Sequence, residues 1–349
     1  NIAIGYNSLL TEDTGKFSIA IGVGALQTQN NDGNNYNTAV GHEAGKLVTI
    51  GIQNTLIGGL AGDAITTVSN TTAVGYNSLG ANTTGTSNTA VGDVSATSNT
   101  TGSNLAAFGR YALYSNTTGA NNIGVGFQSL FGNTTASNNT AVGFQSLLAN
   151  TTADNNTAVG TSALTANTTG DRNVALGAFS LDANTTASGG TALGHNALST
   201  NTTGTTNTAV GFHALHVNTT GGTNVAVGGS ALQANTTASN NTAVGTSALT
   251  ANTTGTENVG LGRYSLYTST TGDYNTAVGT NALFAATTAS NNTAVGRTAL
   301  FENTTGANNT AVGYSALKTN TTASNNTAVG YSALTANTTG ENNVALGFG

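Results

Sequence analysis

Two carboxylates at equivalent positions of neighbouring repeats are the first residues whose type and spacing could support chemistry. Asp154 and Asp171 are 17 residues apart, each six residues before a recurring glycine. If the repeats stack as adjacent strands, the two carboxyl groups lie about 5 Å apart, a spacing that retaining glycosidases use. However, Asp273 and Glu341 occupy the same position far along the chain, and Arg172 directly follows Asp171. Acidic side chains that lie on turns without a catalytic role explain this pattern better than an active site does, and we expect no enzyme.

Histidine is the next residue type with possible chemistry. His213 and His216 lie three residues apart, and His195 lies one repeat earlier. An axis relating several chains could gather them around a metal, but exposed decoration is the simpler interpretation. Cysteine is absent, and so is the Gly-Gly-x-Gly-x-Asp pattern of calcium-binding β-rolls. The sequence predicts no metal site and no cofactor.

Asn-Thr-Thr triplets are the most prominent polar motif. Each matches the Asn-x-Thr acceptor of N-glycosylation. Alternatively, the asparagines form a ladder whose amides bond from rung to rung and cap turns. Glycans about 4.8 Å apart would crowd one another, which favours the ladder, although Ser269 and Ala286 interrupt it. The candidate residues are Asn82, Asn99, Asn116, Asn133, Asn150, Asn167, Asn184, Asn201, Asn218, Asn235, Asn252, Asn303, Asn320 and Asn337.

Two further surface motifs have possible binding roles. The threonine pairs could present a hydroxyl lattice to ice, provided that one threonine of each pair faces outward on a strand. Aromatic residues often follow the recurring glycine and could contact sugars or neighbouring fibres, or simply cover a turn. At the same position stand Thr161, Arg263 and Arg297. The aromatic residues are Tyr76, Phe127, Phe144, Phe212, Tyr314, Tyr331 and Phe348.

A 17-residue repeat must position all these side chains. Ala-Val-Gly or a close variant ends at a glycine every 17 residues from Gly58 to Gly347, and Gly5, Gly22 and Gly41 extend the series upstream with one step of 19. Such self-similarity is the signature of a solenoid. We expect about 21 coils in one continuous array over residues 1–349, with the 19-residue step forming an outward loop. The chain begins and ends within a repeat, so we expect it to be part of a longer one.

The residue pattern within a repeat predicts β-structure. Asn-Thr-Ala-Val-Gly alternates as a short strand, and too few bulky residues recur at helical spacing to form a helix. We expect a second strand around Ala-Leu and a return turn at Asn-Thr-Thr-Gly. Stacking in register makes ladders of identical residues, with Val142 over Val159 and Leu147 over Leu164 as core ladders. The fold class is therefore all-β, a parallel β-solenoid or β-roll.

Composition excludes several function classes. The chain has 47 Gly, no Pro and a formal net charge of −6, with only seven Lys or Arg. These scattered cations cannot track a phosphate backbone, so we expect no nucleic-acid partner. The apolar runs are too short to insert into a membrane. One Val and one Leu per coil make only a thin core. Because rows of small residues also permit chains to pack closely, we expect several chains to share one core.

The repeats resemble the head repeats of trimeric autotransporter adhesins, the YadA-like family, whose signature is Asn-Ser-Val-Ala-Ile-Gly. The matching segments are Asn1–Gly5, Asn173–Gly177 and Asn224–Gly228. Trimeric phage tail-fibre-like proteins carry similar units. The resemblance implies a left-handed roll, three chains about one axis, and attachment to a host or neighbouring cell. The repeat unit of that family is shorter than 17 residues. Family members also carry a coiled-coil stalk and a membrane anchor, for which residues 1–349 show no pattern.

These observations predict a structural shaft of an extracellular fibre or adhesin, on a cell surface or a virion. The expected partners are further copies of the chain, most naturally three in total, and a host-surface or glycan ligand. An alternative is a self-assembled fibril, coated in sugar and without a receptor. A lesser alternative is an ice-binding solenoid.

Overall fold

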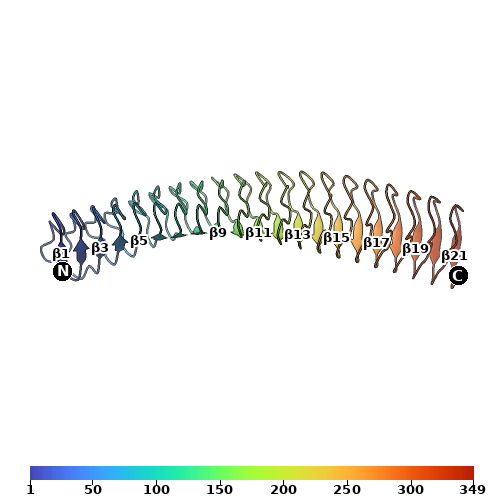
Figure 1. The fold of residues 1–349 in the computed structure, drawn as a ribbon, viewed down its shortest axis with the longest axis horizontal. Coiled ribbons are helices and arrows are strands. Elements are labelled where there is room, and N and C mark those ends of the chain that lie inside the picture. Colours follow the sequence, from blue (N-terminus) through green and yellow to red (C-terminus); the bar gives the residue numbers. More distant parts are fainter. The chain divides into compact units, whose positions relative to one another are not determined.

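The computed structural model describes all residues, 1–349, and is entirely β-structure and turns (Figure 1). It divides into two compact units, Asn1–Asn173 and Val174–Gly349. The first holds β1 (Ile2–Ile4), β2 (Ile19–Ile21), β3 (Thr38–Val40), β4 (Thr55–Ile57), β5 (Thr72–Val74), β6 (Thr89–Val91), β7 (Ala106–Phe108), β8 (Ile123–Val125), β9 (Thr140–Val142) and β10 (Thr157–Val159). The second holds β11 (Val174–Leu176), β12 (Thr191–Leu193), β13 (Thr208–Val210), β14 (Val225–Val227), β15 (Thr242–Val244), β16 (Val259–Leu261), β17 (Thr276–Val278), β18 (Thr293–Val295), β19 (Thr310–Val312), β20 (Thr327–Val329) and β21 (Val344–Leu346).

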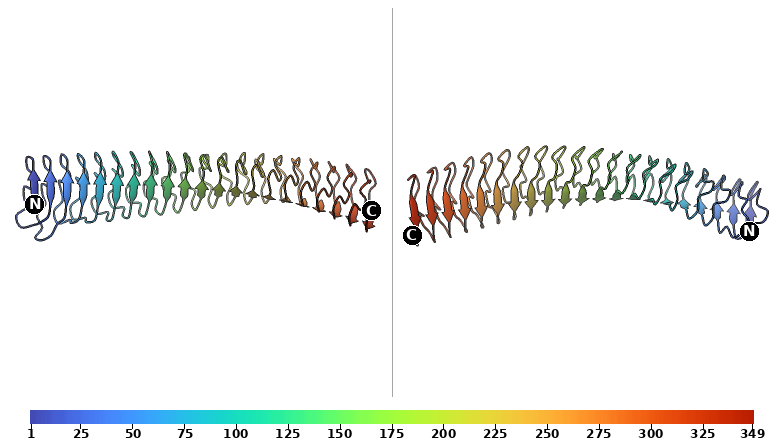
Figure 2. Two further views of the ribbon diagram at one scale, coloured as in Figure 1. Left: turned by 60° about the horizontal axis from the view of Figure 1, so that its bottom comes forward. Right: turned by 180° about the vertical axis from the view of Figure 1, so that it is seen from behind.

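Within each unit, every strand pairs in parallel with the strand of the next coil (Figure 2). In the first unit β9 and β10 align Thr140 with Thr157 and Val142 with Val159. In the second, β12 and β13 align Thr191 with Thr208. The predicted all-β parallel solenoid with 17-residue coils is confirmed. The prediction of one array without a boundary over residues 1–349 stays a prediction.

Each coil contains one strand, so the second strand predicted around Ala-Leu is wrong. In the coil after β9, the Ala-Leu equivalent is Ser146-Leu147, which lies in consecutive turns. Gln145 and Leu147 have φ of 54° and 49°, in the left-handed region. That conformation interrupts an extended chain and is uncommon for a bulky L-residue, so sequence preference alone does not reveal it.

The glycine that ends each strand, here called the repeat glycine, is required by the close approach of coils. Gly143 has φ of 134°. A Cβ atom built there would lie 2.5 Å from the carbonyl oxygen of Gly160 in the next coil. No side chain fits in that space, which explains why this residue recurs in every coil.

The interior of a coil is narrow and holds leucine and alanine. Leu147 and Leu164 are fully buried, as is Ala141 in the middle of β9. Val142 and Val159 form the predicted ladder but lie on the opposite, outer side of the strand, where both are partly exposed. The pairing of the two valines is as predicted, whereas their place in a core shared with other chains stays a prediction. The inward residue is small because a leucine of the preceding turn already fills that space: at the equivalent position of β8, a Cβ atom on Gly124 would lie 3.4 Å from Leu113 Cγ.

The 19-residue step produces a wider turn near the N-terminus. Figure 2 shows dark-blue loops there reaching farther from the strands than those of the following coils. Lys16 bridges to Asn34, and the rings of Phe17 and Tyr36 stack with their centroids 5.3 Å apart. The predicted outward loop is confirmed, and it is fastened to the preceding coil.

Candidate functional site

The asparagines of the Asn-Thr-Thr triplets form a ladder inside the coils. Asn133 Nδ2 donates to Asn116 Oδ1 at 2.7 Å and to Ala136 O at 3.0 Å. Asn150 Nδ2 donates in the same way to Asn133 Oδ1, at 2.9 Å. Every predicted rung except Asn337 is buried. Each buried amide thus satisfies one neighbour above or below and one carbonyl of its own turn.

The ladder is interrupted where the sequence replaces asparagine. Ser269 and Ala286 occupy two successive rungs after Asn252. Asn252 Oδ1 and Ser269 Oγ are buried there without a hydrogen-bond partner. Two unsatisfied oxygens are costly in a dry interior, so this is a weak point in the second unit.

Burial distinguishes the two interpretations of the triplets. An N-linked glycan replaces one hydrogen of the asparagine Nδ2 and needs free space around it. Asn133 Nδ2 uses both of its hydrogens inside the coil. A folded coil therefore accommodates the bare ladder at this position and leaves no space for a glycan.

A second asparagine ladder, which sequence reasoning missed, runs beside the first. It is formed by the asparagine four residues before the repeat glycine. Asn122 Oδ1 accepts a hydrogen bond from the backbone nitrogen of Asn139 at 3.0 Å, and Asn139 Nδ2 donates to Ala153 O at 2.9 Å. Asn150 Nδ2 donates to the same Ala153 oxygen at 3.0 Å, so one carbonyl joins both ladders. The signal was the first asparagine of Asn-Thr-Ala-Val-Gly, which recurs in most coils.

The carboxylates considered for catalysis form turn hydrogen bonds. Asp154 Oδ1 accepts from the Ser137 backbone nitrogen at 2.6 Å, and Asp171 Oδ1 accepts from the Asp154 nitrogen at 2.8 Å. Asp273 Oδ1 accepts likewise from Thr256, at 2.6 Å. A hydroxyl performs the same task where Ser137 accepts from Ala120 at 3.0 Å. Aspartate and serine therefore serve the same turn hydrogen bond at this position, and Ala120 shows that a coil also forms without a side-chain acceptor there.

The histidines form a stacked aromatic cluster in the second unit. The ring centroids of Phe212 and His213 are 3.9 Å apart, and those of His213 and His216 are 4.7 Å apart. Burial lowers the pKa of His213, and the neighbouring His216 and His195 lower this pKa further. No three His, Cys, Asp or Glu side chains in the chain are arranged to hold a metal ion.

Side chains one and three residues before each repeat glycine form the outer strand face. It combines a row of Thr, Val or Ile, with Ala106 as the exception, and a row of Val, Leu, Ile or Phe. In the second row, Phe108 in the first unit is 41% exposed and Leu176 in the second is 46% exposed. The sequence places no charged residue at either position. A continuous apolar row of this kind is unusual on a surface that faces only water.

The aromatic residues after the repeat glycine stack on one another. Tyr314 and Tyr331 lie 5.0 Å apart with an interplanar angle of 13°, and Tyr331 and Phe348 lie 5.1 Å apart at 5°. Their ring faces cover one another, so these rows offer mainly edges to a ligand. The threonine pairs, such as Thr134 and Thr135, lie in bends instead of strands. The geometry that an ice-binding role required of these pairs is thus not met.

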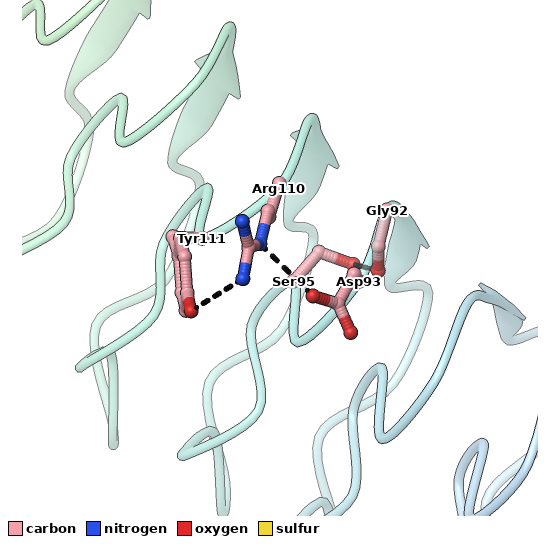
Figure 3. A network of polar contacts seen from close by, with 5 residues as sticks. All are labelled: Gly92, Asp93, Ser95, Arg110 and Tyr111. Carbon is pink, nitrogen blue, oxygen red and sulfur yellow. Dashed lines mark hydrogen bonds and ion pairs between the residues drawn. The ribbon is translucent and has the colours of Figure 1, made fainter.

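An arginine and a tyrosine make a defined polar cluster in the first unit (Figure 3). Arg110 Nε pairs with Asp93 Oδ2 at 3.0 Å across adjacent coils. A terminal nitrogen of the same guanidinium donates to the Tyr111 hydroxyl at 2.9 Å, and the guanidinium carbon lies 4.6 Å from the Tyr111 ring centroid. Tyr111 in turn meets Tyr114 edge to face at 5.6 Å. The guanidinium is thereby fixed in one orientation.

The wider surface is smooth. It has no pocket, and none of the chain forms a helix with the length and hydropathy needed to cross a bilayer. Neither a family model nor a curated protein sequence matches this chain.

Proposed function

We propose that the chain is the shaft of an extracellular fibre or adhesin, assembled from three copies of itself, and that it has a structural role in surface attachment. The outer strand face carries this proposal. It is uncharged, half-exposed and in register from coil to coil within each unit. A second sheet can pack against such a face at about 10 Å.

The small interior of the coil supports association through this face. Inside, each regular coil buries one leucine, one or two alanines and two asparagines, as Leu147, Ala141, Asn139 and Asn150 illustrate. The valine row is left partly exposed, and association would remove it from water. Three copies arranged about an axis would place the three valine rows together and leave the turns outside.

The use of polar side chains also favours a structural role. Asn133, Asn139 and Asp154 each hold adjacent coils together through hydrogen bonds. The residues that could have supported catalysis therefore maintain the stack. The resemblance to YadA-like head repeats agrees with a shaft that displays a regular surface over a long distance.

Multi-angle light scattering of the purified chain tests the proposal. We expect a mass about three times the single-chain 34.3 kDa. Charges on the outer strand face, in Val142→Lys with Val159→Lys, should give single chains. The matched control, Thr135→Lys with Thr152→Lys, places two charges on exposed turns of the same coils and should leave the mass unchanged. A single-chain mass for the parent protein, or a trimer that survives the valine changes, would sink the proposal.

A further inference from the structure

One sequence departure from the repeat occurs twice, once in each unit. The hexapeptide Gly-Arg-Tyr-x-Leu-Tyr spans residues 109–114 and 262–267. In both copies the arginine lies over the adjacent tyrosine ring, with the guanidinium carbon 4.6 Å from the Tyr111 centroid and 4.5 Å from the Tyr264 centroid. A guanidinium nitrogen also donates to the hydroxyl of that tyrosine, at 2.9 Å in the first copy and 3.1 Å in the second.

The aromatic surroundings of the two copies agree as well. Tyr111 meets Tyr114 edge to face at 5.6 Å, and Tyr264 meets Tyr267 edge to face at 5.2 Å. The second tyrosine of each copy stacks on a phenylalanine of the next coil, at 5.0 Å and 5.2 Å. The same sequence therefore builds the same fixed arginine twice.

The two copies differ in what faces the guanidinium. In the first, Asp93 of the preceding coil supplies a carboxylate 3.0 Å from Arg110 Nε (Figure 3). In the second, Thr246 occupies the position equivalent to Asp93, and Arg263 has no ion-pair partner. The first copy is neutralised within the chain, whereas the second leaves an oriented guanidinium open to solvent.

We propose that Arg263, held by Tyr264, binds the carboxylate of an acidic polysaccharide. The first copy identifies the matching group, because there the protein itself places a carboxylate on the same guanidinium. Arginine binds carboxylates with directed, charge-assisted hydrogen bonds. The tyrosine contacts fix the arginine before the ligand arrives, which lowers the entropy lost on binding.

The surrounding surface favours a sugar chain over a peptide. Backbone groups of this coil are already paired, since Leu266 N donates to Ala282 O and Gly262 N donates to Val244 O. A peptide therefore has no free strand edge to extend, and no pocket receives its side chains. A saccharide needs neither a strand edge nor a pocket, and it can lie against the exposed Arg263 and the neighbouring Tyr264.

A second arginine extends the site along the same unit. Arg297 lies 5.9 Å from the Tyr314 ring centroid and also lacks a carboxylate partner. It is two coils beyond Arg263 at the same position of the repeat, which corresponds to about 10 Å along the stack. Two cations in a line suit a linear polymer that carries a carboxylate at regular intervals.

Isothermal titration with polygalacturonate, a linear polyuronate, tests this site at low ionic strength. Arg263→Gln should weaken binding by about two- to fivefold, as expected of one exposed ion pair. Thr246→Asp, which recreates the first copy, should weaken binding similarly while keeping the arginine. In Arg110→Gln, the matched control in the first unit, binding should be unchanged. Asp93→Thr should strengthen binding by opening the first copy.

Several results would overturn the assignment. Parent protein that does not bind polygalacturonate, or variants that all bind like the parent, would remove the site. Equal binding of dextran, which is neutral, would show that the carboxylate is irrelevant, and tighter binding of polyglutamate would point to an acidic peptide. Circular dichroism confirms that each variant keeps its β-structure. The mass measurement described above is a separate readout, so failure of this site and failure of the trimer are distinguishable.

Discussion

Two stretches of the first unit fill the same interior in different ways. The coils that begin at Gly41 and Gly58 place Val48 and Ile65 where later coils place Asn82 and its successors. These two coils also have Gly45 and Gly62 in place of the buried leucine. We call residues 41–74 the apolar coils and residues 75–173 the asparagine coils.

The volume lost at the two glycines is recovered by one strand residue. Leu56 replaces the inward alanine of β4 and is fully buried. A Cβ atom on Gly45 would lie 2.5 Å from Leu56 Cδ1, and one on Gly62 would lie 2.8 Å from Leu56 Cδ2. The backbone thus sets the shape of the interior, and apolar or hydrogen-bonded side chains can fill it. The ladder of Asn82 and its successors is therefore not needed to form a coil.

In the asparagine coils, the buried amides specify the register in which adjacent coils stack. Each Asn133-type amide has a fixed partner 17 residues away and a fixed carbonyl three residues away. Slippage by one residue would leave both hydrogens buried and unpaired, which is costly. The apolar coils lack this ladder at Val48 and Ile65. Their register-specific side-chain bonds are those of the second ladder, where Asn54 accepts from the Thr71 nitrogen at 3.0 Å and donates to Val68 O at 2.9 Å.

The largest expected effect is loss of the leucine that fills the apolar coils. Leu56→Ala should destabilise these coils by about 3 kcal/mol, because a cavity opens beside Gly45 and Gly62. Adding Gly62→Leu should restore part of this stability, since Leu79 occupies the equivalent left-handed position, with φ of 51°. Urea unfolding, followed by amide hydrogen exchange of each coil, measures both effects. No recovery in the double variant would contradict the volume argument.

Removing one rung should affect the asparagine coils somewhat less. Asn133→Ala leaves Asn116 Oδ1 without its donor and removes one of the two acceptors of Asn150 Nδ2, at a cost of about 2 kcal/mol. Faster amide exchange should be confined to the neighbouring coils, because contacts in a solenoid are between nearest neighbours. Val48→Ala is the matched change in the apolar coils and should disturb no hydrogen bond. Equal effects on exchange at both sites would contradict the distinction.

Repairing the interrupted ladder should have a smaller, stabilising effect. Ser269→Asn offers a donor to Asn252 Oδ1, which is buried without a partner. We expect a gain of about 1 kcal/mol, the net value of a hydrogen bond, read as slower amide exchange in the coils around residue 269. Ser265→Asn, at a buried serine already bonded to Gly262 O, is a control that should not stabilise. An unchanged or faster exchange in Ser269→Asn would refute the repair.

The smallest expected effect is a pH dependence of the stability of the coils that contain His213, a residue on the surface of the second unit. The pKa of His213 lies below its usual value in the folded chain, so the unfolded chain binds more protons. The stability of these coils is full above about pH 6.5 and falls as the pH drops through that value. Urea midpoints at several pH values should show this decline, and His213→Gln should reduce it. An identical decline in the variant would assign it to other groups.

The regular spacing made much of the fold predictable. A 17-residue period fixes which residues face each other, so the pairing of Val142 with Val159 and the burial of Leu147 followed from position alone. The Asn133 ladder could be predicted for the same reason. The sidedness of the strand could not, because alternation gives two faces without saying which is inside. Valine is the bulkier residue, yet the narrow interior accepts Ala141.

The turns carried the features that sequence reasoning missed. Leu147 adopts a left-handed conformation that its side chain disfavours, and the stack enforces it. The Asn139 ladder was concealed because its residue also begins the strand motif. The sequence did not reveal that Arg263 lacks an ion-pair partner. This was recognised only by comparison with Arg110, which pairs with Asp93 of the preceding coil, where Arg263 has Thr246 instead.

The constant separation of hydrogen-bonded partners has a genetic consequence. Because Asn133 bonds to Asn116, and Asn150 to Asn133, deletion of one whole repeat would join two surfaces that already fit. Duplication would be equally harmless. Recombination that adds or removes whole 17-residue repeats would therefore lengthen or shorten the molecule in complete steps, without any change in how it folds.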